Sequence, residues 1–199
     1  NSVHMFGSYL GGTGTSMLSS CLSLNTTGQT NVDVRNNIFV NTMTGGGASN
    51  VHCCVHLPSG GTSAMNFTEN NNAYFCGTTA GVQGLGYAGT TYAAANLYSA
   101  ANFNPALTTP ATNWRAYTST LNAAGTNDNA SFALTSAAPF NTSTNLHINT
   151  SATGVASINS GGAVIASVTD DIDGDVRTGP DMGADEFVLD SEALKEGLA

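Results

Sequence analysis

The sequence has little charge, and most of its charge is negative. Lysine and arginine together account for 4 of 199 residues, against 13 aspartates and glutamates, which gives a formal net charge of −9. Proteins that bind nucleic acids need a basic surface to neutralise phosphates, and this chain has too few cations to form one. The same shortage disfavours anionic membranes and polyanionic substrates. We therefore expect no nucleic-acid partner, and a neutral surface that suits an extracellular setting and contacts with neutral glycans.

Long apolar runs and a metal-binding cysteine spacing are also missing. A membrane-spanning helix needs about 20 consecutive apolar residues, and no stretch approaches that length, so we expect no membrane insertion. The four cysteines are not spaced as zinc ligands, since Cys53 and Cys54 are adjacent. In a secreted protein, these thiols could pair with one another.

Turn-forming residues are abundant instead. Glycine accounts for 23 residues, while serine, threonine and asparagine recur throughout the chain. This composition has too many turn formers for a helical protein, and a hydrophobic content of 41% is too high for a disordered one. Short strands joined by tight turns fit best, in a single domain large enough to bury a core.

The first third of the chain repeats itself. Residues 19–24 (S-S-C-L-S-L) align with residues 52–57 (H-C-C-V-H-L), and residues 32–40 (V-D-V-R-N-N-I-F-V) align with residues 67–75 (F-T-E-N-N-N-A-Y-F). The offset of roughly 33 to 35 residues is typical of a stacked solenoid. Apolar residues alternate within the short strands, so we expect one face of each strand to point inward.

This register makes two predictions about stacked side chains. Asn37 should lie above Asn72, where the two amides can hydrogen-bond, and asparagine also tolerates the left-handed backbone that a sharp corner needs. Cys21 should lie above Cys54 in the next coil. Neighbouring strands are about 4.8 Å apart, which is within the range that a disulfide accepts. A disulfide between these two cysteines and a pair of free buried thiols are the alternatives.

The middle of the chain is less regular. Residues 77–112 contain several glycines and then an alanine-rich run, and we expect a long loop or an irregular coil there. Residues 113–125 should form a short helix, with Asn113 as its N-cap and Gly125 as its C-terminal stop.

Much of the charge lies in one stretch near the end, residues 170–187, which we call the closing segment. Asp171, Asp173 and Asp175 alternate there, and oxygen ligands at positions 1, 3 and 5 begin loop-type Ca²⁺ sites. The glycine comes too early for that pattern, however, and no glutamate follows at position 12. These carboxylates therefore form either a Ca²⁺ site or the caps of tight turns.

Arg177 is the only cation of the closing segment. We expect it to form a buried ion pair with Asp185 or Glu186. Removing the arginine would leave a buried carboxylate unpaired and would cost several kcal/mol.

The closing segment resembles the end of secreted bacterial right-handed parallel β-helix proteins, particularly those exported to the cell surface by the type IX secretion system. Residues 171–177 read D-I-D-G-D-V-R and residues 180–187 read P-D-M-G-A-D-E-F, which are close to the family's D-I-D-G-x-x-R and P-D-x-G-A-x-E-[FY]. The segments at 128–140 and 144–148 resemble the coils that precede this ending. One departure is Ala138, where the family usually has aspartate. This ending marks the fold and says little about chemistry.

The resemblance implies an all-β, right-handed parallel β-helix with one short helix and an irregular closing segment. Residues 1–189 would be its C-terminal coils, which stack on upstream coils of the same protein, and residues 190–199 would be a tail or linker. A non-catalytic structural or adhesive role outside the cell or at its surface follows, with glycans or other surface proteins as partners. The alternative is a carbohydrate-active enzyme whose active site lies upstream or near Asp33 and Glu69.

The enzyme alternative has few candidate residues. Glycoside hydrolysis needs two carboxylates at a defined separation, and Asp33 and Glu69 lie on aligned strands one coil apart. Polysaccharide lyases, which share the fold, need a base and nearby cations, and Arg35, Arg115, His52 and His56 are the available side chains. The two histidines should share an outward face, where they either bind a transition metal or have no role. The outward threonine ranks that ice binding requires do not recur at the solenoid period.

Overall fold

The computed structural model describes residues 1–10, 17–47, 49–80, 82–90, 93–106 and 108–189. Within these residues the chain forms mainly short strands, together with one α-helix, α1 (Trp114–Ser119). Short 3₁₀ turns lie at Ser63–Met65, Ala94–Asn96, Ala100–Asn102 and Val155–Ser157. No helix of the described part is long and apolar enough to cross a bilayer. The chain is therefore predominantly β, as its composition predicted.

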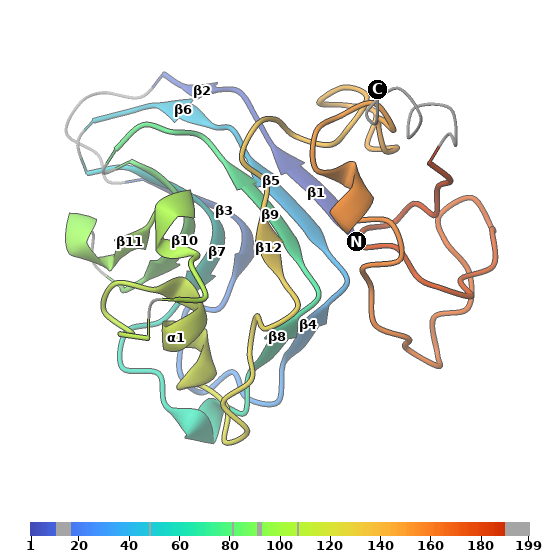
Figure 1. The fold of residues 1–199 in the computed structure, drawn as a ribbon. Coiled ribbons are helices and arrows are strands. Elements are labelled where there is room, and N and C mark those ends of the chain that lie inside the picture. The colour runs from blue at the N-terminus through green and yellow to red at the C-terminus, as the bar shows by residue number, and fades with distance from the viewer. Residues whose placement is uncertain (11–16, 48, 81, 91–92, 107, 190–199) are drawn as a thin grey trace.

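Two four-stranded sheets form the body of the molecule (Figure 1). The first has the order β1-β5-β9-β12 and is parallel throughout. Its strands are β1 (Ser2–Met5), β5 (Ile38–Asn41), β9 (Ala73–Cys76) and β12 (Phe132–Ala133). The second has the order β11-β10-β7-β3, in which only β11 is antiparallel. Its strands are β3 (Leu18–Ser23), β7 (Val51–Leu57), β10 (Gln83–Ala88) and β11 (Leu97–Tyr98).

Two parallel strand pairs extend these sheets. They are β2 (Ser8–Tyr9) with β6 (Thr44–Gly45), and β4 (Asp33–Arg35) with β8 (Thr68–Asn70). Strands β1, β2, β3 and β4 thus each pair with a strand that follows one repeat later in the chain.

The strand register confirms both repeat alignments. Ser19 pairs with His52 in the second sheet, and Ile38 pairs with Ala73 in the first. Both pairs have the spacing along the chain that the alignments predicted. The aligned stretches are therefore neighbours in space, with corresponding positions side by side.

Asparagines form the corners of successive layers. Asn31 and Asn36 have φ of 57°, and their counterparts Asn66 and Asn71 have φ of 45° and 52°. Left-handed backbone of this kind is costly for most residues but accessible to asparagine, whose side chain bonds locally. The corners also bond to each other, because Asn66 Nδ2 donates to Asn31 Oδ1 at 2.9 Å. The repeated asparagines thus fix where the chain turns.

The main core lies between the two four-stranded sheets. Phe39 and Tyr74 contribute from the first sheet, Val55 and Leu57 from the second, and Trp114 of α1 completes the cluster. These residues are at most 4% exposed. Their burial excludes water from a continuous apolar layer, which is the main favourable term in folding.

The outer face of the first sheet is covered as well. Ile38 and Val40 of β5 point away from the main core and pack in a second cluster with Phe140, Ile148 and Met182 from the C-terminal third. We expected only one apolar face for each strand, and this was wrong for β5, all four residues of which are buried. A parallel strand covered on both faces reads as a continuous apolar run, here I-F-V.

The expectation of an irregular stretch over residues 77–112 was wrong in part, because it contains β10. The glycines of β10 interrupt the apolar alternation by which a strand is recognised. Each of them lies where a larger side chain would collide with a neighbour. A Cβ on Gly86 would lie 2.3 Å from the Trp114 ring, and one on Gly84 would lie 2.6 Å from Leu97. The predicted helix is present but shorter, and Asn113 caps it by accepting the N–H of Ala116 at 2.9 Å. The predicted tail, residues 190–199, lies outside the described residues.

Candidate functional site

The carboxylates proposed for glycoside hydrolysis point to opposite faces of their sheet. Asp33 is exposed and forms an ion pair with Arg35, whose Nε donates to Asp33 Oδ1 at 2.7 Å. Glu69 pairs in register with Val34 rather than with Asp33, and both Val34 and Glu69 are buried. Because neighbouring residues of a strand alternate between faces, Asp33 and Glu69 do not converge on one substrate.

Glu69 instead belongs to a buried polar cluster. The Tyr74 hydroxyl lies 2.9 Å from Glu69 Oε1 and 2.8 Å from Asp128 Oδ1, and Thr118 of α1 donates to Asp128 Oδ2 at 3.0 Å. All four residues are 0% exposed. The Tyr74 hydroxyl carries one proton but has two carboxyl neighbours, so one carboxyl group must be protonated and donate to it.

Glu69 is the protonated member of this cluster. Burial, together with the negative charge of Asp128, raises the pKa of Glu69 well above its usual value. Burial also raises the pKa of Asp128, but hydrogen bonds from Ser131, Tyr74 and Thr118 act in the opposite direction. A proton therefore stays on Glu69, which is hydrogen-bonded to both Tyr74 and Asp128, and Tyr74 donates to the Asp128 carboxylate. The arrangement joins β8, β9 and α1, and it has no solvent access for a substrate.

The two strand histidines are buried, so the expectation that they face solvent was wrong. Ser19 Oγ lies 2.8 Å from His52 Nδ1, and Ser23 Oγ lies 2.7 Å from His56 Nδ1. Each Nε2 contacts a backbone carbonyl, that of Gly45 for His52 and that of Gly89 for His56. Because both ring nitrogens of each histidine are already bonded, neither offers a lone pair to a metal ion.

The cysteines do not form the disulfide that the register allowed. All four, Cys21, Cys53, Cys54 and Cys76, are free thiols. Cys54 Sγ lies instead 3.3 and 3.2 Å from the carbonyl oxygens of Phe39 and Phe75. Burial raises the pKa of the Cys53 and Cys54 thiols well above the usual value, which makes them unreactive. The thiols are thus free, as the alternative predicted, but only Cys54 of the predicted pair is buried, whereas Cys21 is half-buried.

The asparagine ladder runs along one edge of the first sheet. Asn72 Oδ1 accepts both the Asn37 N–H and the Asn37 Nδ2, each at 2.9 Å. Asn37 Oδ1 accepts from Asn1 Nδ2 at 3.1 Å on one side, and Asn72 N–H donates to Ser131 Oγ at 3.0 Å on the other. The side chain of each layer therefore satisfies backbone and amide groups of the next.

In the closing segment, Arg177 pairs with Glu186, one of the two partners expected for it. Arg177 Nε donates to Glu186 Oε1 at 2.7 Å, and the two side chains are only 7% and 15% exposed. A second guanidinium nitrogen donates to the carbonyls of Asp181 and Gly183. Asp185, the other expected partner, accepts the Ile148 N–H instead. The arginine thus holds the closing segment together.

The three alternating aspartates do not gather around a common point. Asp171 Oδ1 accepts the N–H groups of Asp173 and Asp175, and its Oδ2 accepts that of Glu186. Burial opposes the ionised form of Asp171, but these backbone hydrogen bonds prevail and lower its pKa. Asp171 is therefore a turn cap, and the Ca²⁺ site expected from these three residues is not assembled.

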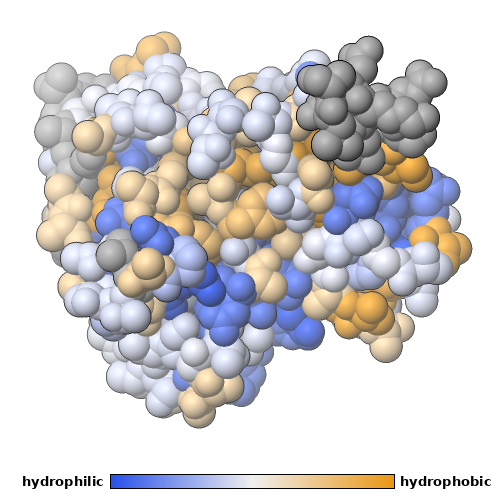
Figure 2. All heavy atoms as spheres, viewed as in Figure 1, coloured by the Kyte–Doolittle hydropathy of each residue, from blue (hydrophilic) through white to orange (hydrophobic). Residues whose placement is uncertain are grey.

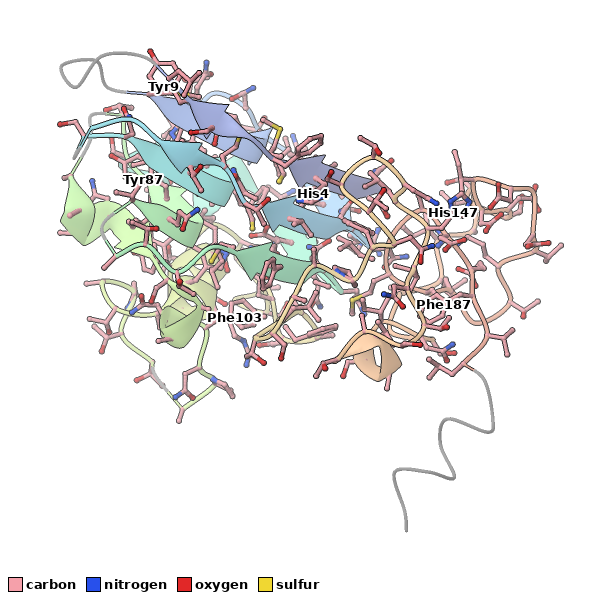
Figure 3. All side chains as sticks on the ribbon, turned by 90° about the horizontal axis from the view of Figure 1, so that it is seen from above. His4, Tyr9, Tyr87, Phe103, His147 and Phe187 are labelled. Carbon is pink, nitrogen blue, oxygen red and sulfur yellow. The ribbon has the colours of Figure 1, made fainter. Side chains whose placement is uncertain are left out.

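A different set of metal-ligating side chains does meet. One ligand atom each from His147, Asp173 and Asp185 lies within 4.8 Å of the others, the one such group found among the described residues. A cavity of about 230 Å³ adjoins it, lined in part by His147 and Asp185. Figure 3 places His147 among the C-terminal loops, at the opposite end of the molecule from Tyr9 and Tyr87. Sequence patterns assigned no role to His147, because both of its partners lie much further along the chain, in the closing segment.

A large groove lies between the two sheets, beside the ends of β9 and β11. It has a volume of about 640 Å³. Phe75, Gln83, Asn102 and Ser136 are among the described residues that line it, and none of these lining residues is acidic, basic or a histidine. On the face that Figure 2 shows, most residues are of intermediate hydropathy, with hydrophobic residues near the middle and toward one side and hydrophilic residues beside them.

Comparisons with protein-family models, with curated proteins and with solved structures found no match to the chain.

Proposed function

We propose that residues 1–189 form a right-handed parallel β-helix that serves as a non-catalytic, extracellular structural or adhesive module, of the kind that the type IX secretion system exports. The observation that carries this proposal is the repeated parallel register with its asparagine ladder. Three layers stack in the first sheet through β1, β5 and β9, and each layer bonds to the next through backbone and side chains. Such stacking makes a stiff body that resists proteases.

The end strands of both sheets support further stacking. Strands β1 and β3 each have one unpaired edge within the described residues. Open edges of this kind are templates for additional strands. Upstream coils of the same protein would add to them and lengthen the module.

Neutral glycans fit the large groove better than charged ones. Its described lining combines hydroxyl and amide groups with an aromatic ring, Phe75, and contains no charged side chain. Neutral sugars need such hydrogen-bonding partners and apolar faces, whereas a polyuronate would need cations that the groove does not provide. The net charge of −9 also disfavours polyuronates, because it repels their carboxylates.

A binding panel tests the adhesive role. The purified chain is immobilised and exposed to neutral polysaccharides and, separately, to polyuronates. Binding to at least one neutral polysaccharide is expected, together with a large loss of binding in Ser136→Trp, which fills the mouth of the groove. Ser167→Trp, a substitution at an exposed site outside the groove lining, should bind as the wild type does.

The same panel, read for product release, tests the enzyme alternative. We expect no oligosaccharides to be released from any polysaccharide. Release that is lost in Asp33→Asn would show that the chain is an enzyme and would overturn this proposal.

The structural role is tested by digestion with thermolysin. This protease cleaves beside apolar residues, whereas the chain has only four lysines and arginines for trypsin. Rapid digestion of the native chain would contradict a stiff module.

A further inference from the structure

We propose that His147, Asp173 and Asp185 bind a first-row divalent transition metal ion of the Zn²⁺ type, which ties the loops of the C-terminal third together. This site is separate from the groove assigned to glycans. His147 lies in a loop that precedes the closing segment, the closing segment supplies Asp173 and Asp185, and none of the three residues lies in a regular strand or helix.

The distances suit such an ion. His147 Nε2 lies 3.0 Å from Asp173 Oδ2, and a carboxylate oxygen of Asp185 completes a set within 4.8 Å. Bonds from Zn²⁺ to imidazole nitrogen and carboxylate oxygen measure about 2.0–2.2 Å, so neighbouring ligands of a tetrahedral site lie roughly 3.3–3.5 Å apart. Small movements of two side chains that are about half exposed, His147 at 51% and Asp173 at 53%, bring the set to that geometry.

The tautomer of His147 provides a second, independent indication. Its Nδ1 lies 2.7 Å from Asn145 Oδ1, an oxygen that also accepts the His147 backbone N–H. An amide oxygen only accepts hydrogen bonds, so Nδ1 carries the proton of the neutral ring, and Nε2 presents its lone pair. That lone pair faces the Asp173 carboxylate, and two acceptors in contact require a metal ion or a second ring proton between them. Metal-bound histidines are commonly held in this way by an oxygen on the other ring nitrogen.

Asp185 is a preformed ligand. Its side chain is only 8% exposed, and its Oδ2 accepts the Ile148 N–H at 2.8 Å, which fixes the plane of the carboxylate. Within the described part of the chain, no residue donates a hydrogen bond to its Oδ1. A carboxylate oxygen without a hydrogen-bond donor, beside an imidazole lone pair, is free to bind a positive ion.

The ligand set selects the class of metal. Ca²⁺ and Mg²⁺ prefer oxygen ligands alone, in sets of six or more, whereas one imidazole with two carboxylates suits Zn²⁺ and its neighbours in the first transition row. Three protein ligands leave at least one coordination position for water. The ion proposed here therefore differs from the Ca²⁺ that the aspartate spacing alone suggested, and Asp171 and Asp175 take no part in binding it.

Binding would link the loop that carries His147 to two turns of the closing segment, which carry Asp173 and Asp185. Asp173 lies in the exposed turn capped by Asp171, His147 lies in a preceding loop, and Asp185 follows Arg177 in the closing segment. An ion that binds only the folded chain stabilises it by RT ln(1 + [M]/Kd), so the melting temperature should rise with metal concentration.

The test uses the chain stripped with EDTA, dialysed free of the chelator, and titrated with Zn²⁺ alone in a calorimeter. One Zn²⁺ per chain is expected, with at least a tenfold loss of affinity in His147→Ala and in Asp173→Asn. Asp175→Asn removes an exposed aspartate two residues away and should bind as the wild type does. Co²⁺ in place of Zn²⁺ should give the visible absorption of a four- or five-coordinate site in the wild type and lose it in His147→Ala.

Two results would overturn the proposal. One is the absence of saturable Zn²⁺ binding, with NMR showing that the His147 imidazole is doubly protonated at neutral pH, because a second ring proton then satisfies the contact with Asp173. The other is Zn²⁺ binding that His147→Ala and Asp173→Asn leave unchanged, which would place the ion elsewhere. Equal unfolding midpoints of the metal-free wild type and His147→Ala would establish that the variant is folded.

Discussion

Replacing Glu69 with glutamine should make the protein less sensitive to rising pH. The glutamate is fully buried against Tyr74 and Asp128, and it stays protonated because burial and the Asp128 charge raise its pKa well above the usual value. Glutamine has nearly the same shape as a protonated glutamate and carries no titratable proton. Glu69→Gln therefore leaves the packing in place and removes one linkage between folding and pH.

The magnitude follows from one proton. An exposed glutamate in the unfolded chain loses its proton near a pH of about 4.3, while buried Glu69 keeps it to a higher pH. Folding therefore takes up one proton between these two values, and the wild-type chain loses stability as pH rises through that window. The loss is about tenfold in the unfolding equilibrium constant for each pH unit. Below about pH 4, both forms of the chain carry the proton and the Glu69 contribution to stability is fully present.

Urea unfolding at a series of pH values from acid to slightly alkaline measures the effect. The single tryptophan, Trp114, is 0% exposed in the main core and reports unfolding by fluorescence. The free energy of unfolding of Glu69→Gln minus that of the wild type should rise with pH from about pH 4.5 upward. Parallel wild-type and Glu69→Gln curves would refute the assignment of the proton to Glu69.

Three further substitutions test the ladder, the ion pair and the core. Asn72→Ala leaves several buried polar groups of the ladder unpaired and should destabilise the protein by about 2–4 kcal/mol in urea unfolding; a loss below about 0.5 kcal/mol would deny the ladder a structural role. Arg177→Met should cost about 3–5 kcal/mol in the same assay. Adding Glu186→Gln should recover part of that loss, and a double variant no more stable than the single one would contradict the ion pair. Gly86→Ala places a methyl group against the tryptophan ring and should lower stability by about 1–3 kcal/mol. Gly28→Ala meets only an ordinary contact and should be close to neutral, so equal urea midpoints of the two glycine variants would contradict the tight packing at Gly86.

The first layers of the fold could be predicted from the sequence because each strand there aligns with its partner at nearly constant spacing. In parallel strands, residues separated by a constant number of positions lie side by side. The alignment of residues 19–24 with 52–57 therefore predicted which residues are neighbours. The contact between Asn37 and Asn72 followed from the same register. Local patterns also located α1 and its cap, since an asparagine cap and the first turn are close in sequence.

Contacts between distant segments were beyond such patterns. Glu69 and Asp128 meet although a long stretch of chain separates them, and the Asp128 side chain reaches the cluster from a corner outside the repeat. Strand β10 was missed because of its glycines: Gly86 makes room for Trp114 of α1, and Gly84 makes room for Leu97 of β11, both of which come later in the chain. The histidines of β7 were expected to face outward, but both are buried, and segments outside that strand supply the hydrogen-bond partners of their rings. In each case the position of the side chain depends on packing against distant segments, which the sequence of a single strand does not reveal.

The length of chain between successive strands of the first sheet varies greatly, and this has a practical consequence. Strand β5 pairs with β9 through Ile38 and Ala73, but β9 pairs with β12 through Ala73 and Phe132, which are much further apart along the chain; both pairs are parallel. The long connection between β9 and β12, which includes β10 and α1, therefore leaves the parallel pairing of β12 with β9 intact. Foreign sequence inserted at the exposed position Asn104, within that long connection, should be tolerated. A single residue inserted into β9 would instead turn the remaining side chains of that strand to the wrong face.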